Sequence, residues 1–81
     1  MEVRLLLFAV LRDIVGADRK TVELTEGATA ADLWRRLADE HPRLGAFPGP
    51  PLVAVNQEYA DPAAPLRAGD EVAFIPPVSG G

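Results

Sequence analysis

The two most apolar strand-like stretches of the chain lie at its opposite ends, and this arrangement restricts the folds open to it. Val3–Leu7 is a largely apolar, β-favouring run, and Glu71–Ile75 is a second one. Strands of this composition are typical of positions covered on both faces. We therefore expect the first and last strands to be central, adjacent and parallel.

Between these runs, the periodicity predicts a short helix and a second strand. Phe8, Leu11 and Val15 recur at helical spacing, and Gly16 suits a helix end. The segment "KTVEL", residues 20–24, alternates polar and apolar residues and predicts a half-buried strand.

The main helix is expected in "TEGATAADLWRRLADEHP". Thr29 can cap its first turn, and Asp32 can return the capping hydrogen bond. Pro42 ends the helix at or before His41. Residues 43–51 are rich in Gly and Pro and are expected to be loop. The apolar stripe of the helix consists of Ala30, Leu33, Leu37 and Ala38.

The C-terminal half predicts three further strands, which complete an α+β pattern. They are expected at residues 52–55, 58–60 and 71–75, with turns at 56–57 and 68–70. The expected arrangement is a mixed sheet of about five strands with a short helix after the first strand. The single long helix packs on one face of this sheet, and the packing buries both its own apolar stripe and that face. This is the β-grasp, or ubiquitin-like, fold. We expect one domain over residues 1–75 and an extended functional tail over 76–81.

Composition excludes several classes of function. The 81 residues contain no Cys and one His, so neither a disulfide framework nor a thiolate or histidine metal site is expected. The net charge of −4 disfavours binding to nucleic acid and to anionic membranes. The apolar run near the N-terminus is too short to span a bilayer and lacks a signal-peptide cleavage site. A soluble cytoplasmic protein is expected.

The expected folded body offers no catalytic side chain. His41 is placed to interact with the last carbonyls of the main helix. Trp34 lies beside the apolar stripe, either at the edge of the core or as an anchor for a partner. Asp70 is expected to hydrogen-bond within its own turn. Ser79 has no histidine that could activate it.

The C-terminal "PPVSGG" is the segment with a recognisable chemical use. Pro76 and Pro77 stop strand pairing and favour an extended conformation. Residues 76–81 could then reach about 20 Å, and the terminal glycines fit where a partner closes on the backbone. One interpretation is an arm that delivers the carboxylate of Gly81 to a partner's active site. The other is a frayed end with accidental glycines.

The same residues carry a resemblance to a known family. "LFAVLRDIVG", "LVAVNQEYAD" and above all "PLRAGDEVAFIPPVSGG" resemble the MoaD family of ubiquitin-like sulfur carriers, the small subunits of molybdopterin synthase. The resemblance covers the whole chain and implies the β-grasp fold. It also implies a role in molybdenum cofactor biosynthesis in complex with a catalytic large subunit of the MoaE type, in a heterotetramer.

The resemblance further implies roles for the tail. Gly81 would be adenylated by an E1-like enzyme of the MoeB type, which uses ATP, and converted to a thiocarboxylate. Its sulfur would build the dithiolene of molybdopterin. Gly80 would give a slim approach, and Val78 and Ser79 would line the threaded segment. The chain would bind no cofactor of its own and would add no catalytic side chain to the complex.

The docking surface is expected at the root of the tail, at Phe74, Ile75 and Pro76. Since neighbours on a strand point to opposite faces, either Phe74 or Ile75 must face the core and the other could face the partner. Two alternatives remain open at this stage. The chain could carry sulfur for thiamine or for tRNA thiolation, or it could be a ubiquitin-like modifier.

Overall fold

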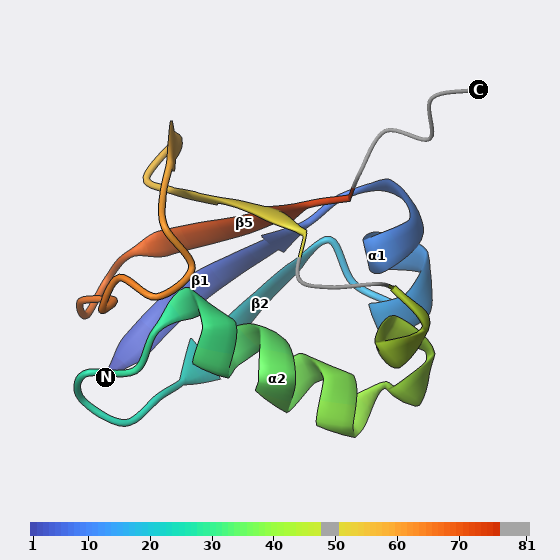
Figure 1. Ribbon diagram of the computed structural model, residues 1–81, viewed down its shortest axis with the longest axis horizontal. Coiled ribbons are helices and arrows are strands. Elements are labelled where there is room, and N and C mark those ends of the chain that lie inside the picture. The colour runs from blue at the N-terminus through green and yellow to red at the C-terminus, as the bar shows by residue number, and fades with distance from the viewer. Residues whose placement is uncertain (48–50, 77–81) are drawn as a thin grey trace.

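The computed structural model describes residues 1–47 and 51–76, which form one five-stranded sheet with helices packed on one face (Figure 1). The strand order is β2-β1-β5-β3-β4. The strands are β1 (Glu2–Leu7), β2 (Arg19–Glu23), β3 (Leu52–Val55), β4 (Glu58–Tyr59) and β5 (Glu71–Ile75). The helices are α1 (Ala9–Val15), α2 (Ala30–Glu40) and the 3-10 helix η1 (Pro42–Ala46).

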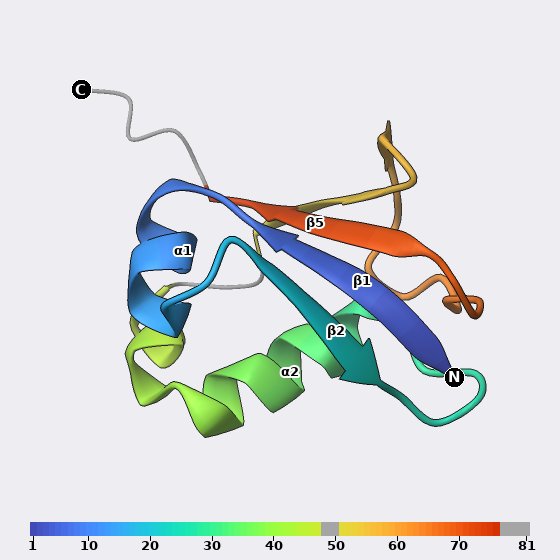
Figure 2. The ribbon, with the colours of Figure 1, turned by 180° about the vertical axis from the view of Figure 1, so that it is seen from behind.

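The first and last strands are neighbours in the middle of the sheet, as the sequence predicts. β1 and β5 run parallel, with Leu5 opposite Val72 and Leu7 opposite Phe74. β2 flanks β1 and β3 flanks β5, both antiparallel (Figure 2). The α+β, β-grasp prediction is therefore confirmed. None of the helices within the two described ranges is long and apolar enough to cross a membrane.

Helix α2 begins at the predicted capping box. The Thr29 hydroxyl accepts a hydrogen bond from the Asp32 backbone N–H at 3.1 Å, and the Asp32 carboxylate accepts one from the Thr29 backbone N–H at 2.9 Å. The hydrogen bond from the Thr29 backbone, followed by the one from the Thr29 side chain, holds the pKa of Asp32 below its usual value. At the other end, the His41 backbone N–H donates to the Leu37 carbonyl at 2.8 Å.

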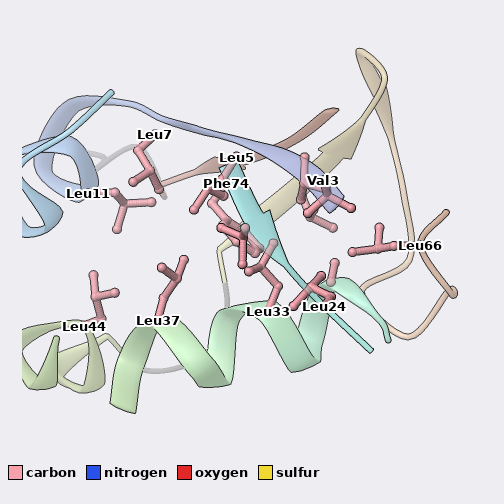
Figure 3. Packing of buried hydrophobic residues seen from close by; sticks show 14 residues of the cluster. Val3, Leu5, Leu7, Leu11, Leu24, Leu33, Leu37, Leu44, Leu66 and Phe74 are labelled. Atoms are coloured by element: carbon pink, nitrogen blue, oxygen red, sulfur yellow. The ribbon is translucent and has the colours of Figure 1, made fainter. Parts of the chain in front are cut away.

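The core lies between the sheet and the helices (Figure 3). Strand alternation points Val3, Leu5 and Leu7 of β1 into it, while Leu33 and Leu37 face them from α2. All five side chains are almost fully buried. The core-edge interpretation of Trp34 holds, because the indole is half-buried and stacks edge-to-face on the buried ring of Phe74, with centroids 5.3 Å apart.

Two local predictions are wrong. Phe8 does not belong to the apolar stripe of the first helix: it is extended, precedes α1, and is 47% exposed. The start of the predicted 43–51 loop is instead part of η1, because Pro42 supplies a helical φ at its first position and Leu44 is buried against the core. Residues 48–50 lie outside the described part of the chain.

The strand boundaries differ only slightly from the predictions. β2 begins and ends one residue earlier than predicted, and β4 ends at Tyr59 rather than Ala60. Shifts of this size are normal at element ends, where the terminal hydrogen bonds decide the assignment.

Candidate functional site

The candidate site is the end of β5 from which the tail continues. β5 ends at Ile75, and Pro76, which follows it, is half-exposed. Five residues of the predicted tail lie outside the described part of the chain: Pro77, Val78, Ser79, Gly80 and Gly81. The structure therefore describes the surface around Ile75, where the tail begins, rather than the tail itself.

The structure distinguishes the two neighbouring docking candidates. Phe74 is 1% exposed and its ring packs on Trp34, so it belongs to the core. Ile75 points to the opposite face, away from the helices, and is partly exposed. Of the two arrangements that the sequence left open, the structure has Ile75 on the outside and Phe74 inside.

Ile75 lies within a group of apolar side chains on the outer face of the sheet, which we call the outer patch. Leu52 is the direct cross-strand partner of Ile75 and is 59% exposed. Tyr59 is 75% exposed. A shallow depression of about 420 Å³ brings Tyr59 and Phe8 together with Ile75. The outer patch consists of Leu6, Phe8, Leu52, Tyr59, Ala73 and Ile75.

The outer patch combines residues from four segments, and an exposed apolar group of this kind is typical of a protein-binding surface. Of the residues in the outer patch, only Ile75 was predicted from the sequence as a docking residue. The signal for Leu52 was present, because the alternation in "LVAV" places Leu52 and Val53 on opposite faces and Val53 is buried. Phe8 was missed because its spacing also suits a helix.

Charged side chains border the outer patch along β1. Arg4 is two residues before Leu6 on the same face and is exposed, and Arg19 of β2 is the register partner of Leu6. Glu71 is the partner of Arg4 on β5. A partner docked on the patch would therefore also meet cationic and anionic side chains on the same face of the sheet, next to the patch.

A hydrogen-bonded turn fixes the position of the β3–β4 hairpin, and with it Tyr59. Asn56 and Gln57 both have positive φ, 52° and 71°, as a tight two-residue hairpin requires. Asn56 Oδ1 accepts from the Glu71 backbone N–H at 3.0 Å, and Asn56 Nδ2 donates to Asp70 Oδ1 at 3.0 Å. The hairpin is thereby tied to the start of β5.

The second Asp70 oxygen accepts from the Arg67 backbone N–H at 2.8 Å. This bond confirms the prediction that Asp70 hydrogen-bonds within its own turn, and the bond to Asn56 adds a link to the neighbouring hairpin. Within residues 1–47 and 51–76, no three His, Cys, Asp or Glu side chains come together as a metal-binding group.

Sequence relatives cover the whole chain. The chain is 41% identical over 83 residues to the molybdopterin synthase sulfur carrier subunit of Chlamydomonas reinhardtii, with 100% of both chains covered. It is 40% identical over 81 residues to the protein of the same name from Escherichia coli strain K12, covering 98% of this chain and 99% of that one.

Solved structures show the same fold. The small archaeal modifier protein 1 of Haloferax volcanii superposes with a TM-score of 0.80 at 30% identity, covering 95% of this chain and 98% of that one. A second match is a complex of subunits 1 and 2 of molybdopterin-converting factor from Helicobacter pylori, with a TM-score of 0.67, 24% identity and 100% coverage of both chains. At that identity the likeness concerns the fold.

The family assignment follows from residues 5–81, which match the ThiS family and include β5 and the complete tail. Together with the full-length relatives, this match establishes that the chain belongs to the ThiS family and within it is similar to the molybdopterin synthase sulfur carrier subunits.

Proposed function

We propose that this chain is a sulfur carrier in molybdenum cofactor biosynthesis, acting as the small subunit of molybdopterin synthase. The observation that carries the proposal is the full-length similarity, at 41% and 40% identity, to two proteins with that name. The outer patch at the end of β5 supports it, because a carrier must dock on its partners close to the point where its reactive tail begins.

In this proposal the reactive group is the carboxylate of Gly81. A carboxylate is a poor electrophile, so an activating enzyme first joins it to the α-phosphate of ATP, and pyrophosphate leaves. A sulfide equivalent from a donor then attacks the acyl carbon of the adenylate, and AMP leaves. The product is a thiocarboxylate at Gly81, in which one oxygen has been replaced by sulfur.

The chain contributes presentation rather than side-chain chemistry. Pro76 and Pro77 lack backbone N–H groups, so they cannot extend the pairing of β5. Residues 76–81 can reach about 20 Å from the sheet when extended. Val78 and Ser79 would line the threaded segment, and Gly80 and Gly81 would pass where side chains do not fit.

Two partners follow from this chemistry. One is an E1-like activating enzyme of the MoeB type, which brings the ATP. The other is a catalytic large subunit of the MoaE type, with which the chain would form a heterotetramer. The similarity of the fold to a structure described as a complex of subunits 1 and 2 of molybdopterin-converting factor supports the second partner. We assign the outer patch, with Ile75 and Pro76, to these contacts.

A second candidate function is that of a ubiquitin-like modifier. The observation that favours it is the match to the archaeal small modifier protein at 30% identity over nearly the whole chain. The same adenylate would then be attacked by a lysine amine, and the product would be an isopeptide. Such adducts on lysines in extracts of the source organism would support this candidate.

The test is intact-mass spectrometry after incubation with an E1-like enzyme, ATP and a sulfur donor. The expected result is a mass gain equal to the exchange of one oxygen for sulfur, localised to Gly81. A variant that lacks Gly81 but is otherwise identical is the matched control and should show no gain. An unchanged mass with a demonstrably active enzyme would overturn the proposal.

A second measurement separates the molybdopterin pathway from other sulfur acceptors. The thiocarboxylated chain is mixed with a MoaE-type large subunit and cyclic pyranopterin monophosphate. Formation of molybdopterin supports the assignment. A chain that carries sulfur but does not bind this subunit would instead serve thiamine or tRNA thiolation.

A further inference from the structure

The edge of β2 that is not paired with β1 is a second surface on which another strand could pair. β2 is the last strand on its side of the sheet, next to β1 and alongside α2 (Figure 2). It is the longer of the two edge strands, since β4 at the other edge contains only Glu58–Tyr59. Thr21, in the centre of β2, is exposed.

The register of β1 and β2 shows which backbone groups face away from the sheet. The Leu24 N–H donates to the Met1 carbonyl at 2.7 Å, and the Leu7 N–H donates to the Asp18 carbonyl at 3.0 Å. Hydrogen-bonded pairs of an antiparallel ladder recur at every second residue. Val22 and Lys20 therefore also form hydrogen-bonded pairs with their partners on β1. The alternate residues of β2 direct their N–H and C=O groups outward: Arg19, Thr21 and Glu23.

A structural contact supports this orientation. The Glu23 carbonyl oxygen accepts a hydrogen bond from the Arg36 guanidinium of α2, on the side away from β1. A carbonyl has two lone pairs, so this bond leaves Glu23 able to accept a second donor from a strand added at the edge.

We propose that a second copy of this chain pairs with this edge, so that the two β2 strands run antiparallel about a two-fold axis at Thr21. The sequence "RKTVE" then places Arg19 of each copy opposite Glu23 of the other, and Thr21 opposite its own counterpart. These are the residues whose backbone groups point outward. Each of these pairs would therefore exchange both of its hydrogen bonds.

Charge complementarity selects this register and this occupant. Arg19 and Glu23 are both exposed on the outer face, so each guanidinium would lie beside a carboxylate of the other copy. A register shifted by two residues would pair Arg19 or Glu23 with Thr21 and lose both ion pairs. On the helix side, Lys20 would face Val22 of the other copy, and no two like charges would be directly opposite.

The proposed dimer does not depend on the proposed function and leaves it possible. Pairing occurs at the outer edge of β2, whereas Leu52 and Tyr59 of the outer patch lie on β3 and β4, across β1 and β5. A dimer would therefore form a continuous sheet with an accessible outer patch in each half.

The first experiment uses charge reversal, read out by sedimentation equilibrium over a wide range of concentration. The wild-type chain is expected to show a reversible monomer–dimer equilibrium. Arg19→Glu places carboxylates opposite each other and Glu23→Arg places guanidinium groups opposite each other. Each should raise the dimer dissociation constant by about tenfold, since cross-strand charge pairs change sign at two places.

The decisive comparison is the mixture of the two variants. Arg19→Glu and Glu23→Arg are complementary to each other, so their equimolar mixture should form a heterodimer with near wild-type affinity. The double variant should recover self-association. The proposal is overturned if the wild-type chain stays monomeric throughout, or if both single variants dimerise as tightly as the wild type.

Glu23 also accepts a hydrogen bond from the Met1 amino group at 3.0 Å, so its reversal could affect folding. A second measurement therefore uses the unmodified chain. Amide hydrogen exchange of Thr21 and Glu23 should slow as concentration rises, while that of Lys20 and Val22 should be slow at every concentration. Exchange at Thr21 that is independent of concentration would contradict edge pairing.

Thr21→Pro provides the corresponding variant, with Thr21→Val as the control. The Thr21 N–H is directed away from β1, so proline removes a donor that the fold does not use and blocks the approach of another strand. We expect Thr21→Pro to be monomeric and Thr21→Val to dimerise as the wild type does. A Thr21→Pro variant that dimerises normally would exclude β2 as the interface.

Discussion

Leu52 of β3 and Ile75 of β5 are direct partners across antiparallel strands, and both side chains lie on the sheet face that the helices leave uncovered. Their neighbours Val53 and Phe74 form the equivalent pair on the buried face. The same two strands thus contribute to the core on one face and to the outer patch, the docking surface we propose, on the other.

Changing Leu52→Asp should therefore separate binding from stability. Leu52 is 59% exposed, so the thermal melt should change little. Binding to the activating enzyme or the large subunit should weaken by about tenfold or more, because a charge would be buried in an apolar contact. Titration calorimetry measures the affinity. Arg35→Asp, on the solvent-facing side of α2, is the control and should bind normally.

The tail should contribute to activity and not to stability. We expect deletion of Gly81 to abolish sulfur transfer while the melting temperature stays close to that of the full chain, because within residues 1–47 and 51–76 the buried core ends at Phe74. Differential scanning calorimetry and the mass assay test the two halves of this prediction. A large fall in melting temperature would show that the terminal residue packs on the domain.

Leu37→Ala tests the contribution of α2 to the core. Leu37 is 2% exposed between the helix and the sheet, so its truncation should lower the free energy of unfolding by about 2–5 kcal/mol. Urea denaturation provides the value. Asp39→Ala, at an exposed position of the same helix, should cost much less. A loss below about half a kcal/mol for Leu37→Ala would contradict the packing described above, given the usual cost of such cavities.

Asn56→Ala should weaken the link between the β3–β4 hairpin and β5. It removes the bonds to Asp70 and to the Glu71 backbone and places Ala at a positive φ. We expect a loss of about 1–3 kcal/mol by chemical denaturation. Glu58→Ala, an exposed change in the same hairpin, should have little effect. Equal losses for the two variants would show that the Asn56 bonds do not stabilise the hairpin.

The capping box should make stability depend on acid pH. The pKa of Asp32 in the folded chain lies below 3.8, chiefly because of the Thr29 backbone bond. Its contribution is therefore present above the unfolded pKa and is lost as pH falls through the lower folded value. The difference in melting temperature between the wild type and Asp32→Asn should shrink as pH falls below about 4. A difference independent of pH would indicate that the ionised carboxylate is not the stabilising form.

Most of the fold was predictable because its elements have local signals. The Thr29 cap, the stripe from Ala30 to Leu37, and the stop at Pro42 define α2, and the two apolar terminal strands give the parallel centre of the sheet. Phe8 was not predictable in the same way, because its spacing to Leu11 fits a helix and only the chain direction after β1 turns its ring outward. The η1 turn required knowing that Leu44 has a pocket in the core.

The candidate site was predictable in part. Alternation along β5 indicates that Phe74 and Ile75 face opposite sides, but it does not say which side the helices cover. That choice depends on which face of the sheet α2 covers, where Trp34 packs on Phe74, and this is a tertiary property. Tyr59 joins the outer patch only because the hairpin at Asn56 folds β4 back along β3.

The pairing of β1 with β5 also determines when the domain can form. The centre of the sheet joins β1, near the beginning of the chain, to β5, which ends at Ile75. These two distant segments must therefore come together before the core is complete. A chain interrupted before β5 would lack Val72 and Phe74 and could not complete its core. Every copy that folds has therefore been synthesised at least through β5, the strand that leads into the tail.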